Sequence, residues 1–579
     1  MKMATGYPSI DQTHKQGEHF FERHPIIPNI SIYSALCILS NSYRNDVAIN
    51  CHGLNATFSY LLKDSARLSC GLGALGIRSG EIITVCMPNL YQAVAIFFAA
   101  NRMGATVAFL NEFSTCEEIC DYIGLFHSPI LINCGQSEQF NQEILRRTGI
   151  RHIVTLNEAE SESRFLDIIP TAADTHQSLL RYKDLYAIGG KKRFAKTAFS
   201  GSSNALILFT SGTTGTPKSV VLTNRNILAA AIYLKNSSHI SNTRGEKSLI
   251  CVPFTYPYGF CTSLLMSLLC GRQAILTPKL SLDTIDYYIA KKPNIIFGSP
   301  ALLNLFMRGI SKDQELSSIK TFISGGDFLT PNHEKDGKRF FASHGGDVVI
   351  CNGAGNAETT SCGTNLVGVA PRIGSVGRIL TGTDAIIIDP DSHAELQYGE
   401  EGLLCISGKH VFKEYYYDPA TTAAVKWNYK GKIYFQTGML GVLDKEGYFT
   451  ITGREARFYI TSSLNKVYCD RVQSAVAAID VVSMCAVVEV PDSKELFSNC
   501  AFVVPKSDTQ PSKETSAYIM KKCAEPILMP GTELAIMLKP YEIPKDIIFM
   551  KELPRSKSDK IDYNRLKELA LLEHTEANR

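Results

Sequence analysis

The sequence predicts an α/β fold, with a large first domain of stacked αβ layers and a small α+β domain after it. Over the first three quarters of the 579 residues, apolar strand-like runs alternate with amphipathic stretches. No internal repeat of solenoid period interrupts this alternation. The last quarter holds further short apolar runs around one helical stretch, which indicates a second, smaller core.

Two segments of the first domain illustrate the alternation. Ile82 to Cys86 is expected to form a strand, Tyr91 to Asn101 a helix, and Thr106 to Leu110 the next strand. Ile250 to Gly271 is uncharged, but two prolines interrupt it, and we expect a buried strand, a loop and a helix there. This segment is therefore not predicted to span a membrane.

Composition and charge argue against several classes of protein. Lys and Arg total 59 against 56 for Asp and Glu, with no strong basic block, so a nucleic-acid partner is not expected. Residues 1–15 lack the apolar segment of a signal peptide, and the odd number of cysteines, 17, favours reduced thiols and a cytoplasmic location. Cys116 and Cys120 have no second pair at zinc spacing, so we interpret them as core thiols.

The segment from Leu206 to Thr223 combines the features of a phosphate-binding loop. Ala205 to Phe209 and Ser219 to Leu222 are expected to be buried strands on either side of it. Between them, small side chains give hydroxyl donors and let backbone N–H groups approach an anion, and a lysine adds positive charge: Thr210, Ser211, Gly212, Thr213, Thr214, Gly215, Thr216 and Lys218. No glycine directly precedes the lysine, which excludes the P-loop pattern. A Ser/Thr/Gly linker is the alternative.

The loop resembles the phosphate-binding signature of the adenylate-forming superfamily, which includes acyl-CoA synthetases, luciferases and the adenylation domains of nonribosomal peptide synthetases. Further segments match in the family's order across nearly the whole chain: Tyr7 to Asp11, Leu72 to Asn89, Ser324 to Asp327, Gly353 to Glu358, Gly374 to Gly377, Thr437-Gly438, Gly453-Arg454 and Lys560 to Asp562. Such a joint order is very hard to obtain by chance.

The resemblance implies two domains and a rotation between them. Residues 1–454 would form the large domain, including a small β-barrel-like part, and residues 455–579 the small mobile α+β domain. The small domain is expected to contain strands at Met484 to Val490 and Ala501 to Val504 and a helix near Glu514 to Cys523. The hinge position is Ala456, where the family usually has Asp or Lys.

The activity that the resemblance implies is ATP-dependent activation of a carboxylic acid to an acyl-adenylate, with release of pyrophosphate, followed by transfer to the thiol of CoA. Glu358, Lys560 and Thr214 would be the catalytic residues. Glu358 would help to hold Mg²⁺, and Lys560 would contact the carboxylate and the α-phosphate. The nucleotide would also be bound by Gly326, Gly353, Ala354, Gly355 and Arg454.

Each of these charged residues also has an ordinary structural explanation. Glu358 could be a solvated loop glutamate, and Lys560 a surface lysine in a charged segment that also holds Lys557. Arg454 would meet the ribose hydroxyls or hold the interdomain linker, against the alternative of a strand-end arginine in a salt bridge.

By the same resemblance, the acid would lie against Phe254 to Phe260, with Tyr256, Gly259, Ser299 and Gly325 as pocket residues. Walls of aromatic residues and glycine, without an evident buried charge, favour a fatty or aryl acid over an amino acid. Asp327 is the exception, because its carboxylate could serve an ammonium group, although a loop cap after Gly326 is the expected role.

Several residues depart from the family pattern. Met439 replaces the aspartate that hydrogen-bonds both ribose hydroxyls in the family, and Ala354 replaces the aromatic residue that lies against the adenine. Asp444 is close to Met439 in the sequence, but we expect its carboxylate to stabilise the turn that it begins. The other departures are Ala357 for Thr, Leu464 for Gly on the pantetheine path, Asp559 for Gly and Asn224 for His. Two alternatives to a CoA ligase therefore remain: a ligase that hands the acyl group to a carrier protein, and a noncatalytic relative that binds an acyl group or a partner.

Overall fold

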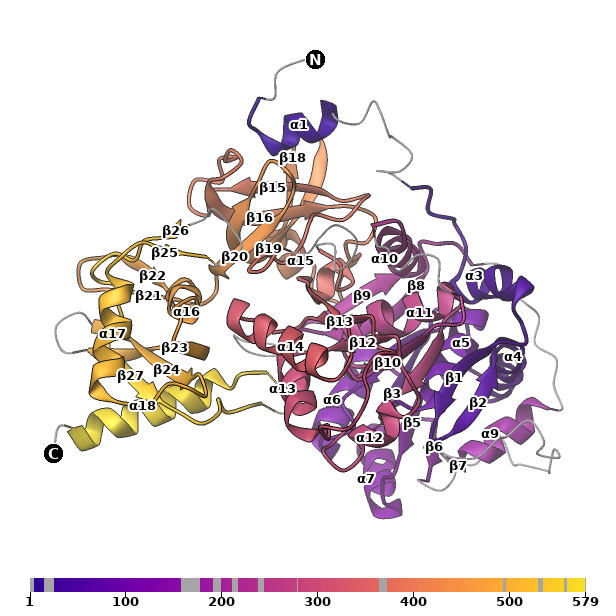
Figure 1. Ribbon diagram of the computed structural model, residues 1–579. Coiled ribbons are helices and arrows are strands. Elements are labelled where there is room, and N and C mark those ends of the chain that lie inside the picture. The colour runs from indigo at the N-terminus through magenta and orange to yellow at the C-terminus, as the bar shows by residue number, and fades with distance from the viewer. Residues whose placement is uncertain are drawn as a thin grey trace.

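A computed structural model describes residues 5–14, 25–157, 178–190, 199–210, 217–237, 244–278, 280–327, 329–363, 372–492, 496–529, 535–556 and 560–577. The structure contains two α/β layers, an antiparallel sheet and a C-terminal α+β unit (Figure 1). The α/β fold class and the smaller unit after it are as the sequence predicts.

The first α/β layer is built on a mostly parallel sheet with the order β17-β9-β8-β4-β3-β5-β6-β7. Its strands are β3 (Ile82–Cys86), β4 (Thr106–Leu110), β5 (Ile130–Cys134), β6 (His152–Leu156), β7 (Leu179–Arg181), β8 (Asn204–Phe209), β9 (Ser219–Thr223) and β17 (Glu414–Tyr415). The last two pair antiparallel, β9 with β8 and β17 with β9. The candidate phosphate loop therefore connects two adjacent strands near one edge of this sheet.

The second α/β layer has the strand order β14-β13-β12-β10-β11-β1-β2. Its strands are β1 (Val47–Cys51), β2 (Leu54–Thr57), β10 (Lys247–Ile250), β11 (Gln273–Leu276), β12 (Ile295–Gly298), β13 (Thr321–Ser324) and β14 (Val349–Asn352). From β1 to β14 the pairs are parallel, and Ser324 of β13 lies opposite Asn352 of β14. The segments that follow β10, β12, β13 and β14 consequently leave the sheet at the same edge.

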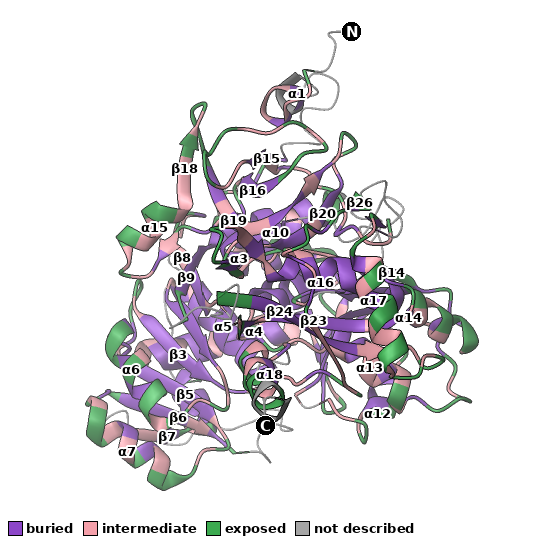
Figure 2. Ribbon diagram, turned by 90° about the vertical axis from the view of Figure 1, so that its left-hand side faces the viewer, coloured by how far each residue is buried: buried purple, intermediate pink, exposed green. Residues whose placement is uncertain are grey.

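Helices cover both sheets and separate them. They are α3 (Ile32–Leu39), α4 (Phe58–Ala74), α5 (Tyr91–Met103), α6 (Cys116–Phe126), α7 (Glu138–Thr148), α9 (Tyr182–Gly189), α10 (Asn224–Ser237), α11 (Met266–Leu269), α12 (Ile285–Ile289), α13 (Pro300–Gly309) and α14 (Pro331–Ser343), with a π-helical segment η4 (Tyr258–Leu265). Twelve of the thirteen residues of α5 are buried, because this helix packs inside the core shared by both sheets. Figure 2 shows this interior as largely buried ribbon.

The antiparallel sheet follows the two layers. It contains β15 (Asp384–Ile388), β16 (Glu401–Ser407), β18 (Lys426–Tyr429), β19 (Lys432–Leu443) and β20 (Phe449–Arg454), and α15 (Pro419–Val425) precedes β18. The N-terminal helix α1 (Pro8–His14) packs on it, and Ser9 donates from its backbone N and its hydroxyl to Glu395 at 2.8 and 2.7 Å. The first and last parts of the large α/β region are thereby joined.

The C-terminal unit has its own hydrophobic core. It contains β21 (Phe458–Ile460), β22 (Lys466–Tyr468), α16 (Cys469–Ala477), β23 (Val482–Asp492), β24 (Leu496–Pro505), α17 (Lys513–Cys523), β25 (Ile527–Leu528), β26 (Ala535–Ile536), β27 (Asp546–Phe549) and α18 (Tyr563–Ala577). The strands β23 and β24 are longer than expected, because they form a continuous antiparallel ladder from Val482 to Asp492. No helix among the described residues is long and apolar enough to cross a bilayer.

Candidate active site

Four sequence-predicted segments leave the second sheet at the edge formed by the carboxyl ends of its strands. Phe254 to Gly259 follow β10, Ser299 follows β12, Gly325 to Asp327 follow β13, and Gly353 to Glu358 follow β14. Ligand sites of α/β sheets form at this edge, because the loops there converge while the strands hold them in register. The structure thus brings together residues that are separated by about 100 positions in the sequence.

Glu358 lies in the short 3₁₀ turn η5 (Ala357–Thr359) and is buried. Its Oε1 accepts a hydrogen bond from the Tyr415 hydroxyl at 2.6 Å, and its backbone carbonyl accepts from Phe412 N at 2.6 Å. Burial raises the pKa of the Glu358 carboxyl, while the Tyr415 hydrogen bond and the Lys218 charge oppose that rise. Glu358 is therefore held by specific contacts, which the alternative of a solvated loop glutamate does not account for.

Tyr415 connects Glu358 to the base of the phosphate loop. It belongs to β17, opposite Val220 of β9, and the Lys218 ammonium lies 5.2 Å from the centre of its ring. Thr210 and Lys218 close the two ends of the loop, since Thr210 N donates to Lys218 O and Lys218 N donates to Thr210 Oγ1, both at 3.1 Å. The loop residues Ser211, Gly212, Thr213, Thr214, Gly215 and Thr216 lie outside the described residues.

Lys560 reaches the same sheet edge from the C-terminal unit. It is half-buried and faces Asp327, which follows β13, and Arg454 at the end of β20. Burial and the Arg454 charge lower the pKa of the Lys560 ammonium to about 8, and the Asp327 charge opposes that shift. Lys560 is therefore no ordinary surface lysine, and Lys557 lies outside the described residues.

Arg454 ends β20 at the junction with the C-terminal unit. Its Nε lies 3.7 Å from Asp470 Oδ2 in α16, and Asp470 also pairs with Arg457. The contact observed for Arg454 is this salt bridge, which the sequence left open as the structural alternative to contacting the ribose or holding the interdomain linker. Ala456 is exposed, two residues further on.

Two glycines of the predicted nucleotide site, Gly326 and Gly355, have backbone reasons to be glycine. Gly326 adopts φ +85°, and a Cβ at Gly355 would collide with the backbone of Ser361. Gly353 N donates to Ser324 O at 3.0 Å and so continues the pairing of β13 with β14. Ala354 packs against an apolar cluster around Ile406 and Phe449, to which Met439 also belongs.

Beside Gly325, where the acid is predicted to bind, lies an aromatic ring that the sequence reasoning did not single out. Tyr258 is buried, donates from its hydroxyl to Ile323 O at 2.7 Å, and lies 3.3 Å from the position of a Cβ at Gly325. A Cβ at Gly259 would collide with the carbonyl oxygen of Pro253, so the chain can pass there only as glycine. Ser299 caps α13 by accepting from Leu302 N, and Tyr256 lies in the turn before η4.

Asp444 and two of the departures from the family pattern, Leu464 and Asn224, lie in described local structure. Asp444 accepts from Tyr448 N at 2.8 Å and pairs with Arg372 at 2.7 Å, so it serves its own turn, as expected. Leu464 adopts φ +62° in the turn between β21 and β22 and is 84% exposed. Asn224 is buried and accepts from Ile32 N and Asn101 Nδ2, which are structural contacts.

Asp327 has a partner that the sequence did not indicate. Its Oδ2 accepts a hydrogen bond from Arg555 Nη1 at 3.0 Å, and Arg555 belongs to the C-terminal unit. Sequence reasoning missed both Arg555 and Tyr415, because the partner of each lies far away in the chain. Tyr415 stands in a run of three tyrosines, which carries no signal as to which hydroxyl turns inward.

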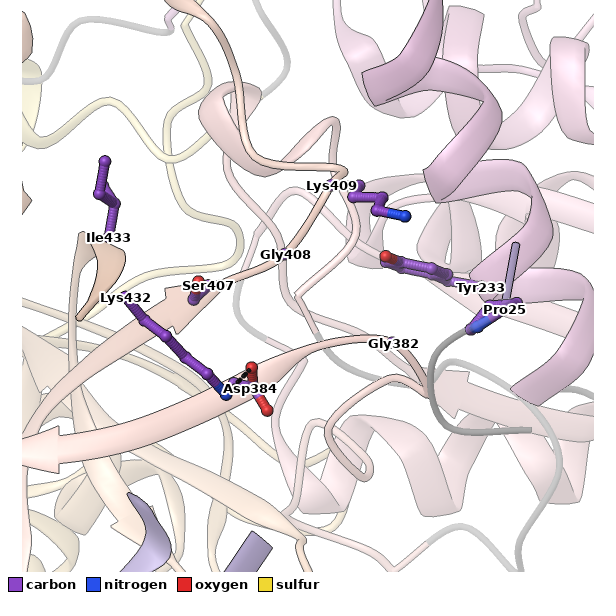
Figure 3. A pocket seen from close by; sticks show the side chains of 9 residues that line it. All are labelled: Pro25, Tyr233, Gly382, Asp384, Ser407, Gly408, Lys409, Lys432 and Ile433. Atoms are coloured by element: carbon purple, nitrogen blue, oxygen red, sulfur yellow. Dashed lines mark hydrogen bonds and ion pairs between the residues drawn. The ribbon is translucent and has the colours of Figure 1, made fainter. Parts of the chain in front are cut away.

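A separate cavity of about 450 Å³ lies between α10 and the antiparallel sheet (Figure 3). Its lining residues are Pro25, Tyr233, Gly382, Asp384, Ser407, Gly408, Lys409, Lys432 and Ile433. Figure 3 shows the pair of Lys432 with Asp384, whose atoms lie 2.8 Å apart. None of the sequence-predicted site residues lines this cavity.

The chain matches two family models and several known enzymes along most of its length. The model of the family described as AMP-binding enzyme matches residues 40–416, and that of the AMP-binding enzyme C-terminal domain matches residues 471–560. The long-chain-fatty-acid–CoA ligase of Bacillus subtilis is 27% identical over 557 residues, which cover 94% of this chain and 95% of that protein. The long-chain-fatty-acid–CoA ligase FadD13 of Mycobacterium tuberculosis is 28% identical over 85% of this chain and 88% of its own length.

A solved structure shows the same fold. The ATP-bound crystal structure of MatB from Rhodopseudomonas palustris superposes with a TM-score of 0.76 at 22% identity, covering 93% of this chain and 99% of that one. The first family model alone spans more than half of the chain, from the residue after α3 as far as β17. Together with the convergence of the motifs at one sheet edge, this match shows that the chain belongs to the AMP-binding enzyme family, the adenylate-forming group that its sequence resembles.

Proposed function

We propose that the protein is an AMP-forming acid–thiol ligase. It activates a carboxylic acid with ATP to an acyl-adenylate, releases pyrophosphate and transfers the acyl group to the thiol of CoA. One observation carries the proposal: the Lys560 ammonium reaches the edge of the sheet where β13 and β14 lead to Asp327 and Glu358. The CoA ligases among the relatives support the same reaction.

The residues of the site divide the reaction between them. Lys560 holds the attacking carboxylate and the α-phosphate together, since its ammonium offsets the charge of both anions. Lys218 and the loop that it closes, including Thr214, surround the phosphates that leave as pyrophosphate. Arg454, already at the domain junction, orients the ribose. The backbone at Gly326, Gly353 and Gly355 gives the nucleotide room to approach.

Glu358 fits a magnesium ligand. A cluster of several ligating side chains is not needed, because Mg²⁺ keeps waters and substrate phosphates in its shell and takes one or two carboxylates. Tyr415 occupies Oε1 of Glu358, and the second carboxylate oxygen is the one that would hold the ion. A bound Mg²⁺ would offset negative charge on the phosphate oxygens during adenylation.

The acid is proposed to be fatty or aryl. Tyr258 and Phe254 give the walls near Gly325 an apolar, aromatic character, and Asp327 is engaged by Arg555. An amino acid would bring an ammonium group that needs a carboxylate partner in this site. The long-chain-fatty-acid–CoA ligases among the relatives favour the same class.

The acceptor and the domain division are also part of the proposal. CoA is the proposed acceptor, and the thiol of a carrier protein is the alternative, with Leu464 as its sequence support. We place the domain boundary between residues 454 and 455, supported by the separate core of the C-terminal unit, and expect that unit to move between the two half-reactions. A cytoplasmic location is supported by the cysteines, none of which forms a disulfide in the part of the chain that the structure describes.

The test is ATP-dependent pyrophosphate release by the purified protein against a panel of fatty, aryl and amino acids. Hydroxylamine traps the acyl-adenylate, and adding CoA or a holo carrier protein identifies the acceptor. Acid-dependent release that CoA stimulates would support the proposed ligase. Pyrophosphate release that only a holo carrier protein stimulates would identify the carrier protein, and not CoA, as the acyl acceptor.

A noncatalytic relative is the second candidate, and one observation favours it. Met439 and Ala354, at the positions for the ribose and the adenine, each pack against the same apolar cluster, and their side chains cannot form the hydrogen bonds that recognise a nucleoside. Absence of pyrophosphate release with every acid, from folded protein at millimolar ATP, would favour this candidate over the ligase.

A further inference from the structure

Asp327 forms an ion pair across the junction between the large α/β region and the C-terminal unit. Its Oδ2 lies 3.0 Å from Arg555 Nη1, and the side chains are 6% and 22% exposed. Asp327 is the third residue after β13, which ends at Ser324, and it directly follows Gly326. A charge pair that is largely removed from water is stronger and more dependent on geometry than one on the surface.

Arg555 belongs to the hairpin that carries Lys560. Arg555 forms an antiparallel bridge with Ile561, Ser556 N donates to Lys560 O at 2.8 Å, and Asp562 N donates to Pro554 O at 2.8 Å. Arg555 and Lys560 therefore stand on the two arms of one hairpin. Holding Arg555 in place also holds the backbone from which the Lys560 side chain extends.

The root of this hairpin is fixed in the C-terminal unit. Leu553 and Ile561 are buried in the same apolar cluster as Val488 and Phe502 of its sheet. The hairpin cannot shift alone without disturbing that core. The ion pair between Asp327 and Arg555 therefore stabilises the position of the whole C-terminal unit against the large α/β region.

Other contacts also cross the junction. Two are partly buried ion pairs, Arg471 with Glu401 and Arg454 with Asp470. The contacts that follow are neutral or exposed. Thr330 Oγ1 donates to Ser483 O at 2.9 Å, and Asn332 Nδ2 donates to Val482 O at 2.8 Å. Arg308 pairs with Glu552 at 3.1 Å, but these side chains are 62% and 72% exposed. The exposed pair crosses the same junction with the same chemistry and provides a matched control.

We propose that Asp327 is a positioning residue for acyl-adenylate formation, which acts by docking the Lys560 hairpin through Arg555. This inference rests on the proposed function and adds a role that the site residues above do not include. The pair forms when the C-terminal unit delivers Lys560, and it must break when that unit moves for thioester formation. Asp327 therefore promotes acyl-adenylate formation and opposes the movement of the C-terminal unit that thioester formation requires.

The charges around the hairpin support this assignment. Asp327 faces both Arg555 and Lys560, while Arg454 approaches Lys560 from the end of β20. His333 at the start of α14 is buried near Arg555, and burial and that charge lower its pKa to about 4, so it is neutral near pH 7. Asp327 is thus the carboxylate that balances two cations delivered by one hairpin.

The experiment compares Asp327→Asn with Glu552→Gln in the full-length protein. Adenylate formation is measured as acid-dependent ATP–pyrophosphate exchange, and thioester formation is measured separately from a supplied acyl-adenylate and CoA. For Asp327→Asn we expect the exchange rate to fall by about 10- to 100-fold, with the KM for ATP nearly unchanged, because the reacting geometry is lost. Thioester formation should stay the same or become faster. Glu552→Gln should change neither step.

A reversed pair, Asp327→Arg with Arg555→Asp, should recover part of the exchange that either single reversal loses. Equal losses in both half-reactions, or unchanged exchange in Asp327→Asn, would overturn the proposal. Circular dichroism of each variant separates these outcomes from misfolding.

Hydrogen exchange of residues 553–562 provides a reading that does not depend on activity. Faster exchange in Asp327→Asn than in Glu552→Gln supports docking by Asp327, and equal exchange in the two variants contradicts it. If the wild type forms no adenylate with any acid, the proposed function fails while this measurement still decides whether Asp327 docks the hairpin.

Discussion

The two sides of the proposed nucleotide site differ in the contacts that hold their residues: the phosphate side has polar contacts and the nucleoside side has apolar packing. On the phosphate side, Glu358 is buried and bonded to Tyr415, whose ring lies beside the Lys218 ammonium. On the nucleoside side, Met439 and Ala354 pack in an apolar cluster. Polar chemistry is thus retained where phosphates would react and replaced by packing where the nucleoside would be recognised.

The largest effect is expected at the charge that completes the phosphate side. Lys560→Ala should reduce acid-dependent ATP–pyrophosphate exchange by about 10²- to 10³-fold, because it removes an ammonium aimed at developing negative charge. Lys557→Ala is the matched control and should stay within about twofold, an expectation from the same principle. A larger loss in the control than in Lys560→Ala would show that the catalytic lysine has been assigned in the wrong register.

Restoring a carboxylate should strengthen the nucleoside side. Met439→Asp is expected to tighten ATP binding by about 10- to 100-fold, because two hydrogen bonds from a ribose to a charged group are gained while part of an apolar cluster is lost. Isothermal titration calorimetry with ATP measures the change, and Met439→Leu is the apolar control. If Met439→Asp binds no better than the control, the ribose does not lie at this position.

Tyr415→Phe tests whether the phosphate side depends on its internal hydrogen bond. The bond to the Glu358 carboxylate is worth about 1.5 to 3 kcal/mol, so its loss should raise the Mg²⁺ concentration that the exchange reaction needs by about tenfold. Titration with Mg²⁺ at fixed ATP measures this shift. Tyr417→Phe is the control, since Tyr417 is 74% exposed. If the Mg²⁺ dependence of the exchange reaction is identical in both variants, the Tyr415 hydroxyl does not support Mg²⁺ binding and the side chain contributes only packing.

The smallest effect concerns pH. The pKa of Lys560 is lowered from 10.5 to about 8, so its ammonium is lost as pH rises through about 8 and adenylate formation should decline by about half there. Because the folded pKa is depressed, the unfolded chain binds more protons between about 8 and 10.5, and this lysine makes stability rise with pH across that window. The pH profile of ATP–pyrophosphate exchange tests whether Lys560 is the titrating group. Asp327→Asn should move the midpoint of this profile to lower pH, because it removes a negative charge near the ammonium.

The fold was predictable from the sequence because its signals are local. The expected strands Ile82 to Cys86 and Thr106 to Leu110 agree with β3 and β4. In the proline-interrupted stretch the expected helix is present as η4 and α11, but the strand β10 ends at its first residue, Ile250. The strands β23 and β24 extend beyond their apolar centres, since backbone pairing continues through residues such as Pro491 and Asp492. Hydrophobicity marks a strand's buried part, and pairing sets its length.

The site was predictable only as far as its motifs extend. The motif residues Glu358 and Lys560 could be named because each stands in a recognisable segment. Their partners could not, since Tyr415 comes 57 residues after Glu358 and Arg555 comes 228 residues after Asp327. A carboxylate in a sequence carries no indication of which distant cation it meets, and this is why Asp327 was expected to cap its own loop.

The attachment of α1 to the antiparallel sheet has a consequence for how the chain is made. Ser9 and Glu395 are 386 residues apart, and Glu395 is 4% exposed once Ser9, Tyr429 and Lys430 surround it. At a synthesis rate of about 5–20 residues per second, the N-terminal helix waits roughly 20–80 s on the ribosome before its partner exists. The residues of α1 are therefore among the last that the large α/β region can put in place, although they are made well before most of it.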